Sequence, residues 1–155
     1  MSERESVCER ETERETERQR ERERPFRALA VAAQTKGNDM QRLARWRAAD
    51  GRGQEATFKL PTGIATDTAK NIYVADEGDN RIRRISCHTN TVATLAGAGR
   101  AGLVDGPGTT ARFNQPCALA IWRSTLLVAD RANNAIRAVN MSDAHVSLLA
   151  GQSSC

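Results

Sequence analysis

Two aspartates, Asp76 and Asp130, are candidate carboxylate ligands, and they occupy equivalent places, each after the same Val-Ala dipeptide. Carboxylates bind divalent cations, and histidines often complete such a site. His88 and His145, however, have no Asp, Cys or Glu at ligand spacing, and we expect them at a turn or a strand edge. No Ser or Cys stands out as a nucleophile. We therefore expect a protein that is not an enzyme and that uses no metal and no cofactor.

A group of arginines could instead bind the phosphates of a nucleic acid. Arg81, Arg83 and Arg84 lie together, and Arg137 occupies the place that matches Arg83 further along the chain. Phosphate contacts supply much of the affinity in such complexes, and the net charge of +4 is compatible with them. Aromatic residues make up only 4% of the chain, which leaves few platforms for stacked bases. The alternative is that these arginines form a solvated strand edge or contact a protein partner.

The four cysteines do not form a recognisable metal or disulfide pattern. Cys8, Cys87, Cys117 and Cys155 are scattered, without a CxxC pair. We expect reduced thiols in a reducing compartment. No apolar run approaches the roughly 20 residues of a membrane span, and the polar N-terminus does not resemble a signal peptide. These features favour a soluble intracellular protein, in the cytoplasm, with no membrane partner.

Most of the candidate residues belong to a sequence that occurs twice, at 58–97 and at 113–151. The offset between the copies is 55 residues at Phe58 and Phe113, and it becomes 54 after a deletion near Asn71. Self-similarity at a fixed period indicates a repeat architecture. The residues that recur include Asp76 with Asp130, Asn80 with Asn134, and Gly97 with Gly151.

Each copy is expected to form four short strands. Residues 72–75 are apolar and β-prone throughout, which suits a strand covered on both faces. Residues 76–80 indicate a turn, in which Gly78 permits a positive φ. Ile82 and Ile85 are three residues apart, so we expect a bulge or a change of face between them. The expected strands are 62–67, 72–75, 81–86 and 91–96 in the first copy, and 117–122, 126–129, 135–140 and 145–150 in the second.

Such units predict an all-β fold built from four-stranded antiparallel β-propeller blades. A linker with the pattern DGxGxxAxF precedes both copies, at 50–58 and 105–113. Its glycines suit a sharp turn, and its phenylalanine suits a return to the core. Propellers have about 4–8 blades. Two complete blades therefore make an incomplete ring, as in a fragment, a truncated copy or half of an assembly, and we expect self-association.

The N-terminal residues differ in composition from the blades at 49–155. Residues 1–24 contain nine Glu and seven Arg with almost no apolar side chains, which predicts a disordered or frayed helical segment. An expanded simple-sequence repeat would also explain this low-complexity head. Residues 25–48 are expected to form a linker or the degenerate end of a preceding repeat.

The repeated residues resemble the NHL repeat family. The resemblance rests on PTGIATD at 61–67, NIYVADEGDNRIRRI at 71–85, VATLAGAG at 92–99 and DGPGTTARFNQP at 105–116. It implies a β-propeller in which Asp76 and Asp130 are structural and bind the turn after an inner strand. The second copy lacks the family's Gly and Asp at 116–122, which makes a ligand site on its loops doubtful.

The resemblance also implies a class of function. The expected function is a non-enzymatic scaffold that binds a protein partner. An RNA-binding propeller fragment that uses the basic third strand is the first alternative, because some NHL propellers bind single-stranded RNA on a positive face. A degenerate, truncated product without independent activity is the second alternative.

Overall fold

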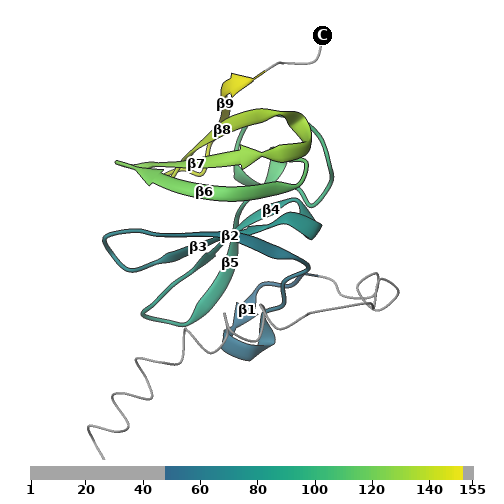
Figure 1. Ribbon diagram of the computed structural model, residues 1–155. Helices are drawn as coiled ribbons and strands as arrows, with labels where there is room; N and C mark the ends of the chain where they lie inside the picture. Colours follow the sequence, from purple (N-terminus) through teal and green to yellow (C-terminus); the bar gives the residue numbers. More distant parts are fainter. Residues whose placement is uncertain (1–47, 152–155) are drawn as a thin grey trace, which may run out of the picture. The chain divides into compact units, whose positions relative to one another are not determined.

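The computed structural model describes residues 48–151, and both of its sheets belong to one compact unit. The described residues form two antiparallel sheets joined by loops and short 3₁₀ turns (Figure 1). The segments predicted at 1–24 and 25–48 lie outside the described residues, except for Ala48. The predicted all-β architecture is confirmed.

The strands of the two sheets follow the predicted order. The first sheet has the order β1-β5-β4-β3-β2 and comprises β1 (Gly51–Arg52), β2 (Pro61–Thr66), β3 (Ile72–Asp76), β4 (Arg81–Ile85) and β5 (Thr91–Ala96). The second has the order β6-β7-β8-β9 and comprises β6 (Pro116–Trp122), β7 (Thr125–Asp130), β8 (Ala135–Asn140) and β9 (Val146–Gly151). The main addition to the prediction is the two-residue strand β1, which the linker contributes to the edge of the first blade.

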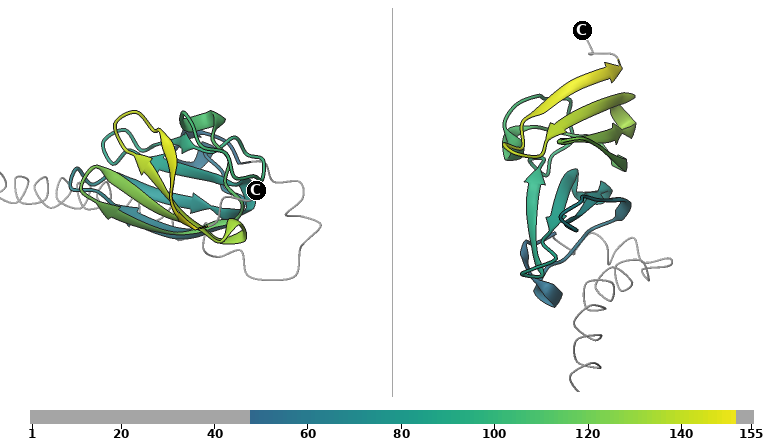
Figure 2. Two further views of the ribbon diagram at one scale, coloured as in Figure 1. Left: turned by 90° about the horizontal axis from the view of Figure 1, so that it is seen from above. Right: turned by 90° about the vertical axis from the view of Figure 1, so that its left-hand side faces the viewer.

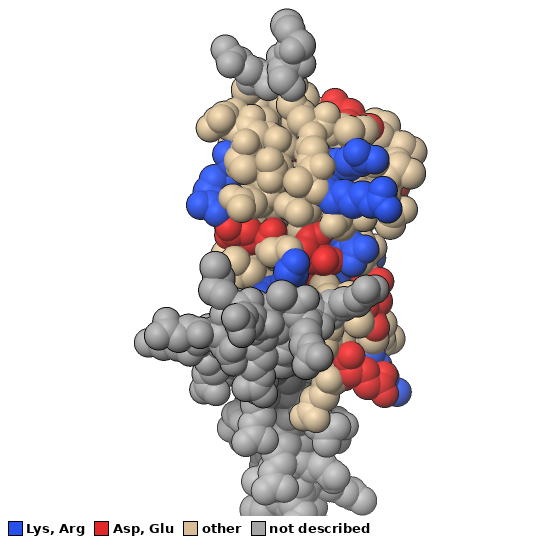
Figure 3. Space-filling view, turned by 90° about the vertical axis from the view of Figure 1, so that its right-hand side faces the viewer, with Lys and Arg blue, Asp and Glu red and all other residues tan. Residues whose placement is uncertain are grey.

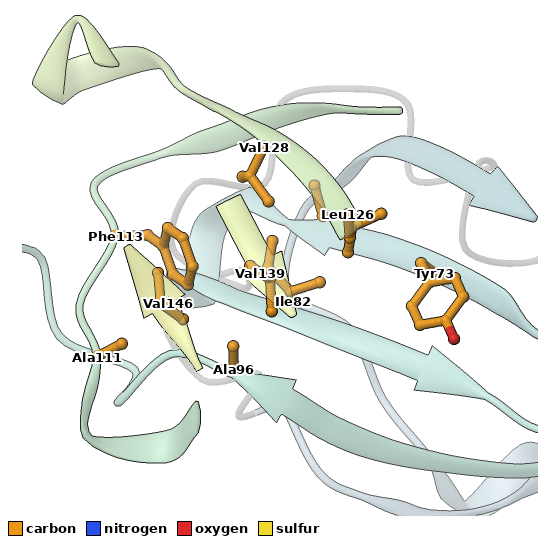
Figure 4. Close-up of a cluster of buried hydrophobic side chains, with 10 residues drawn as sticks. Tyr73, Ile82, Ala96, Ala111, Phe113, Leu126, Val128, Val139 and Val146 are labelled. Atoms are coloured by element: carbon orange, nitrogen blue, oxygen red, sulfur yellow. The ribbon is translucent and has the colours of Figure 1, made fainter. Parts of the chain in front are cut away.

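The main apolar core lies between the two sheets, which stack face to face (Figure 2). The first sheet contributes Ala75 to this core, together with Tyr73, Ile82 and Ala96, which are labelled in Figure 4. The linker contributes Ala111 and Phe113, and the second sheet contributes Leu126, Val128, Val139 and Val146. Each blade alone would leave one of these apolar faces in water, so the stacking of the blades stabilises both.

A glycine allows the first strands of the two blades to approach closely. A Cβ atom at Gly63 in β2 would lie 2.5 Å from the carbonyl oxygen of Cys117 in β6. That separation is too short for two such atoms, so this approach requires glycine. The corresponding residue of the second blade is Ala118, which is exposed.

The turn after the second strand has the same backbone conformation in both blades. The 3₁₀ turns Glu77–Asp79 and Arg131–Asn133 each end in a left-handed asparagine, with φ of 52° at Asn80 and 50° at Asn134. The prediction of a turn is confirmed, but its positive φ belongs to Asn80 rather than to Gly78. Asparagine tolerates this conformation better than most residues.

The expected irregularity in the third strand is present in both blades. The register between β4 and β5 shifts between Ile82 and Arg83, and that between β8 and β9 shifts between Ile136 and Arg137. As a result Ile82 and Arg83 are both fully buried, although they are adjacent in the strand. The bulge therefore lets one strand bury an apolar and a charged side chain.

The hairpin between β2 and β3 holds the chain's single tyrosine. The Tyr73 hydroxyl donates a hydrogen bond to Oδ2 of Asp67 over 3.0 Å, and the Asn71 side chain donates to the same oxygen over 2.8 Å. Burial, together with the hydrogen bond and charge of Asp67, raises the pKa of Tyr73 to about 12. The hydrogen bonds from Asn71 and Tyr73 hold the pKa of Asp67 below its ordinary value despite opposing desolvation.

We expect an absorbance titration at 295 nm to report Tyr73 alone and to have its midpoint near pH 12 in the folded chain. Because the folded pKa is raised, the unfolded chain loses this proton first, and stability should fall as the pH rises from about 10 to 12. In denaturant the midpoint should return toward 10, and Asp67→Asn should lower it in the folded chain. An unchanged midpoint in Asp67→Asn would contradict a role for the carboxylate.

Candidate functional site

The buried arginine of the first blade ties the linker to the third strand. Arg83 donates from Nη2 to the carbonyl oxygen of Ala49 over 2.8 Å and to Oδ1 of Asp50 over 2.7 Å. Its Nη1 donates to the Thr57 carbonyl oxygen over 3.2 Å and lies 3.4 Å from Oδ2 of Asp76. The guanidinium also lies over the ring of Phe58, with Cζ 5.2 Å from the ring centroid. We call this arrangement the arginine clamp.

The second blade repeats the arginine clamp. Arg137 donates to the carbonyl oxygens of Val104 and Arg112 and pairs with the carboxylates of Asp105 and Asp130. Its Cζ lies 5.3 Å from the centroid of the Phe113 ring. The recurrence of every component shows that the clamp belongs to the construction of a blade.

The linker carboxylate of each clamp, Asp50 or Asp105, also accepts a hydrogen bond from the last strand of its blade. Oδ2 of Asp50 accepts a hydrogen bond from the Thr94 backbone N–H over 3.1 Å, and Oδ2 of Asp105 accepts one from Leu148 over 3.0 Å. Desolvation opposes the charge of Asp50, but hydrogen bonds from Thr94 and the nearby Arg83 charge hold the pKa of this carboxyl below its ordinary value. This carboxylate therefore joins the linker, the third strand and the fourth strand of its blade.

The two buried carboxylates, Asp76 and Asp130, bind the backbone at the point where the chain enters each blade. Oδ1 of Asp76 accepts the backbone N–H groups of Lys59 and Leu60 over 2.9 and 3.0 Å, and Oδ1 of Asp130 accepts that of Asn114 over 2.7 Å. Burial raises the pKa of Asp76, while these N–H groups and Arg83 oppose the rise. Both aspartates therefore have structural partners. Their hydrogen bonds reach the residues before the first strand of each blade, and Oδ2 of Asp130 also accepts a hydrogen bond from the Asn133 side chain in the turn after β7.

The expectation of a basic contact surface is corrected for two of its four arginines. Arg83 and Arg137 are fully buried in the clamps and cannot reach a partner's phosphates. Arg84 is exposed, and Arg81 is half-buried and pairs with Asp79 at 2.6 Å. On the face shown in Figure 3, basic and acidic side chains are interspersed and form no patch of one sign.

Polar contacts also connect the two blades. The Gln115 backbone N–H donates to the side-chain oxygen of Asn80 over 2.8 Å. Arg131 at the end of β7 pairs with Glu77 at the end of β3, and it also donates to the Gln115 side chain. Arg131 and Glu77 occupy equivalent places in the repeat, so the same position has opposite charges in the two blades.

The glycine that ends each blade keeps the turn asparagine close. Gly97 has φ of +103°, and a Cβ atom there would lie 2.4 Å from the carbonyl oxygen of Asn80. Gly151 has φ of +116° and the same relation to Asn134, at 2.6 Å. Both the left-handed φ and the close contact require glycine.

The second sheet has a shallow hollow of about 290 Å³ on the face turned away from the first sheet. Small and apolar side chains line it, including Cys117, Ala129, Ile136 and Ala150. The equivalents of the last three in the first blade are Ala75, Ile82 and Ala96, which are all fully buried under the second sheet. Ile136, by contrast, is 39% exposed. We call this surface the open face.

Within residues 48–151, no group of three or more His, Cys, Asp and Glu side chains could hold a metal ion. Cys87 and Cys117 are free thiols. In the same part of the chain, no helix is long and apolar enough to span a membrane.

Two stacked antiparallel sheets with four long strands each, both completed by the same linker and clamp, define a repeat protein of the β-propeller type. Residues 58–85 match the NHL repeat, in agreement with the resemblance seen in the sequence. Among similar curated proteins, Protein SUPPRESSOR OF QUENCHING 1, chloroplastic, of Arabidopsis thaliana is 35% identical over 94 residues, which are 60% of this chain. NHL repeat-containing protein 2 of Bos taurus is 34% identical over 103 residues, or 64% of this chain. The chain spans only 9% and 14% of the lengths of these relatives.

Solved structures support the same fold. A protein of unknown function from Bacteroides thetaiotaomicron matches 61% of this chain and 24% of its own, with a TM-score of 0.58 and 28% identity. An auxiliary nutrient binding protein from the same organism matches 66% of this chain and 26% of its own, with a TM-score of 0.54 and 24% identity. The second likeness concerns the fold alone.

The sequence interpretation missed the role of Asp50 and Asp105. Each opens a DGxGxxAxF linker, yet each contacts an arginine more than thirty positions away. The available signal was recurrence, because the linker aspartate and the third-strand arginine are present in both copies. The neighbouring arginines do not recur: the second copy has Ala135 at the place of Arg81 and Ala138 at the place of Arg84.

We expect Arg137→Met to lower the free energy of unfolding by about 3–5 kcal/mol, because it leaves the buried Asp130 carboxylate without its cation. Arg84→Met, an identical change at an exposed position of β4, should stay within about 0.5 kcal/mol. Urea denaturation followed by circular dichroism measures both. Equal small effects in the two variants would contradict the proposed role of the clamp.

Proposed function

We propose that this protein is a non-enzymatic, propeller-type interaction module that binds a protein partner through the open face of its second blade. The observation that carries the proposal is the difference between the blades. Ile82 is fully buried under a neighbouring sheet, whereas its equivalent, Ile136, is 39% exposed beside an apolar hollow. An exposed apolar surface with a polar rim is typical of a protein-binding site.

The burial and pairing of the most distinctive charged residues support a binding role over a catalytic one. Arg83, Arg137, Asp76 and Asp130 are fully buried and paired with one another, so the most distinctive charged groups stabilise the blades. A catalytic acid or base must reach a substrate within hydrogen-bonding distance. These four side chains are closed off from that use.

The rim of the open face supports a partner that offers both apolar and charged groups. Arg131 is exposed over 56% of its side chain, and it lines the hollow together with Ile136. Arginine at the edge of an apolar patch is common in protein interfaces.

RNA binding is the second candidate, and one observation favours it. Trp122, at the end of β6, is 61% exposed, and Cζ of Arg123 lies 4.8 Å from the centroid of its ring. An exposed aromatic side chain next to a basic one can stack on an unpaired base. The burial of Arg83 and Arg137 removes half of the basic group that sequence alone suggested.

A photo-crosslinker placed on the open face tests the protein-binding proposal. Leu149 in β9 is 59% exposed, whereas its equivalent Leu95 packs against the core between the blades. With p-benzoylphenylalanine in place of Leu149, we expect the full chain to form discrete protein adducts in an extract of its source. The adducts should disappear when Ile136→Arg is added.

The matched control places the crosslinker at Ser147 in the same strand, because Ser147 and its equivalent Ala93 are both exposed. Protein adducts that form equally from both positions, or that persist with Ile136→Arg, would contradict binding at the open face. Adducts to RNA in place of protein would support the second candidate.

A further inference from the structure

A second hollow, of about 320 Å³, lies where the end of β5 meets the linker to the second blade. The Gly97 backbone N–H donates to the Gly108 carbonyl oxygen over 3.0 Å, and that of Ala98 donates to Ala111 over 2.9 Å, so backbone contacts fix the linker there. We call this surface the linker hollow, and none of its lining residues lines the open face. They are Asp50, Arg81, Thr94, Gly97, Ala98 and Thr109.

The positive group of the linker hollow is Arg81, at the start of β4. Its Nη1 donates to Oδ2 of Asp79 over 2.6 Å, and its side chain is 30% exposed. Gly99, with φ of +75°, leaves room for the guanidinium, because a Cβ atom there would lie 2.8 Å from Nη2. Among residues 48–151, Asp79 is the only hydrogen-bond partner of the Arg81 side chain. A guanidinium has several N–H donors, so Arg81 is held in place and retains donors for a ligand.

The negative group is Asp50, whose side chain is 51% exposed although it belongs to the arginine clamp. Oδ1 accepts hydrogen bonds from Arg83 and from the Thr94 hydroxyl, and Oδ2 accepts that of the Thr94 backbone N–H. Desolvation is outweighed by these hydrogen bonds and by the Arg83 charge, so the pKa of Asp50 lies below its ordinary value. A carboxylate oxygen can accept more than one hydrogen bond, which leaves Oδ2 able to bind a further donor.

The second blade shows which of these groups the architecture requires. Ala135 replaces Arg81 and Leu148 replaces Thr94, yet β8 and β9 have the same places in their sheet as β4 and β5. The linker aspartate and the buried arginine, by contrast, are present in both blades. The construction of a blade therefore accounts for the clamp, but it does not account for Arg81 or for the Thr94 hydroxyl.

Two opposite charges thus face one hollow, and each has hydrogen-bonding capacity left. We propose that the linker hollow binds a small zwitterion, a molecule that carries both a carboxylate and an ammonium group, as an amino acid does. Arg81 donates to the carboxylate, and Oδ2 of Asp50 accepts from the ammonium. The exposed Thr109 hydroxyl can donate to the one or accept from the other. Because Asp79 and Arg83 already balance the two protein charges, a ligand without net charge is the best match.

NMR titration of the ¹⁵N-labelled full chain tests the proposal, with glycine, β-alanine and 4-aminobutanoate as probes whose charges lie at increasing separations. The backbone amides of Gly97 and Ala98 line the hollow and report binding directly. We expect saturable shifts of these amides with at least one probe. The amide of that probe lacks the carboxylate and its N-acetyl derivative lacks the ammonium, so each should bind at least about tenfold more weakly.

Two variants that copy the second blade separate binding from folding. Arg81→Ala and Thr94→Leu introduce residues that β8 and β9 already carry, so both should keep the circular dichroism of the natural chain. Each should weaken binding of the probe at least about tenfold, and Arg81→Ala should also remove the preference for the free acid over its amide. Arg84→Ala, which copies Ala138 at an exposed place in the same strand, should bind like the natural chain.

The result that would overturn the proposal is equally specific. Absence of saturable shifts with all three probes, equal binding of the amide and N-acetyl derivatives, or unchanged binding in both variants would show that the linker hollow is not a zwitterion site. Because the open face shares no lining residue with it, none of these outcomes bears on the crosslinking at Leu149.

Discussion

The arginine clamp is the interaction on which the rest of this structure depends. A blade of four strands has no internal means of fixing the loop that leads into it, and the clamp supplies one. Arg83 binds two backbone carbonyls of the linker and two carboxylates, and it lies over the phenylalanine that enters the core. A buried guanidinium is costly unless its charge is matched, and here the partners all bind Nη1 and Nη2, while Nε of Arg83 is buried without a hydrogen-bond partner. The loop must keep these Nη contacts, so it can take few other paths.

Fixing the linker in turn creates the core between the blades. In the second blade the clamp positions Phe113, whose ring lies between the guanidinium and the apolar residues of both sheets. Asp105 also caps Leu148 in β9, so the same network limits the exposed polar edge of that sheet. Charged residues thus determine where the apolar surfaces meet, and the apolar surfaces provide most of the stabilisation.

The strands could be predicted from sequence because local signals determine them. Turn residues such as Asn80 and Asn134 bracket apolar runs, and the observed strand ends differ from the expected ones by at most one residue. The orientation of the arginines could not be predicted in this way. Arg81, Arg83 and Arg84 have similar local surroundings, and only contacts with the distant Asp50 and Asp76 separate the buried one from the others. The open face also depends on which sheet covers which, and that is a property of the stacking.

The opposite charges of Glu77 and Arg131 have a consequence for the symmetry of any closed ring of such blades. If the sign at this position alternates from blade to blade, every junction is attractive only when the number of blades is even. An odd ring would place two like charges next to each other at one junction. In such a ring the repeating unit would be the pair of blades, because only a pair contains both charges.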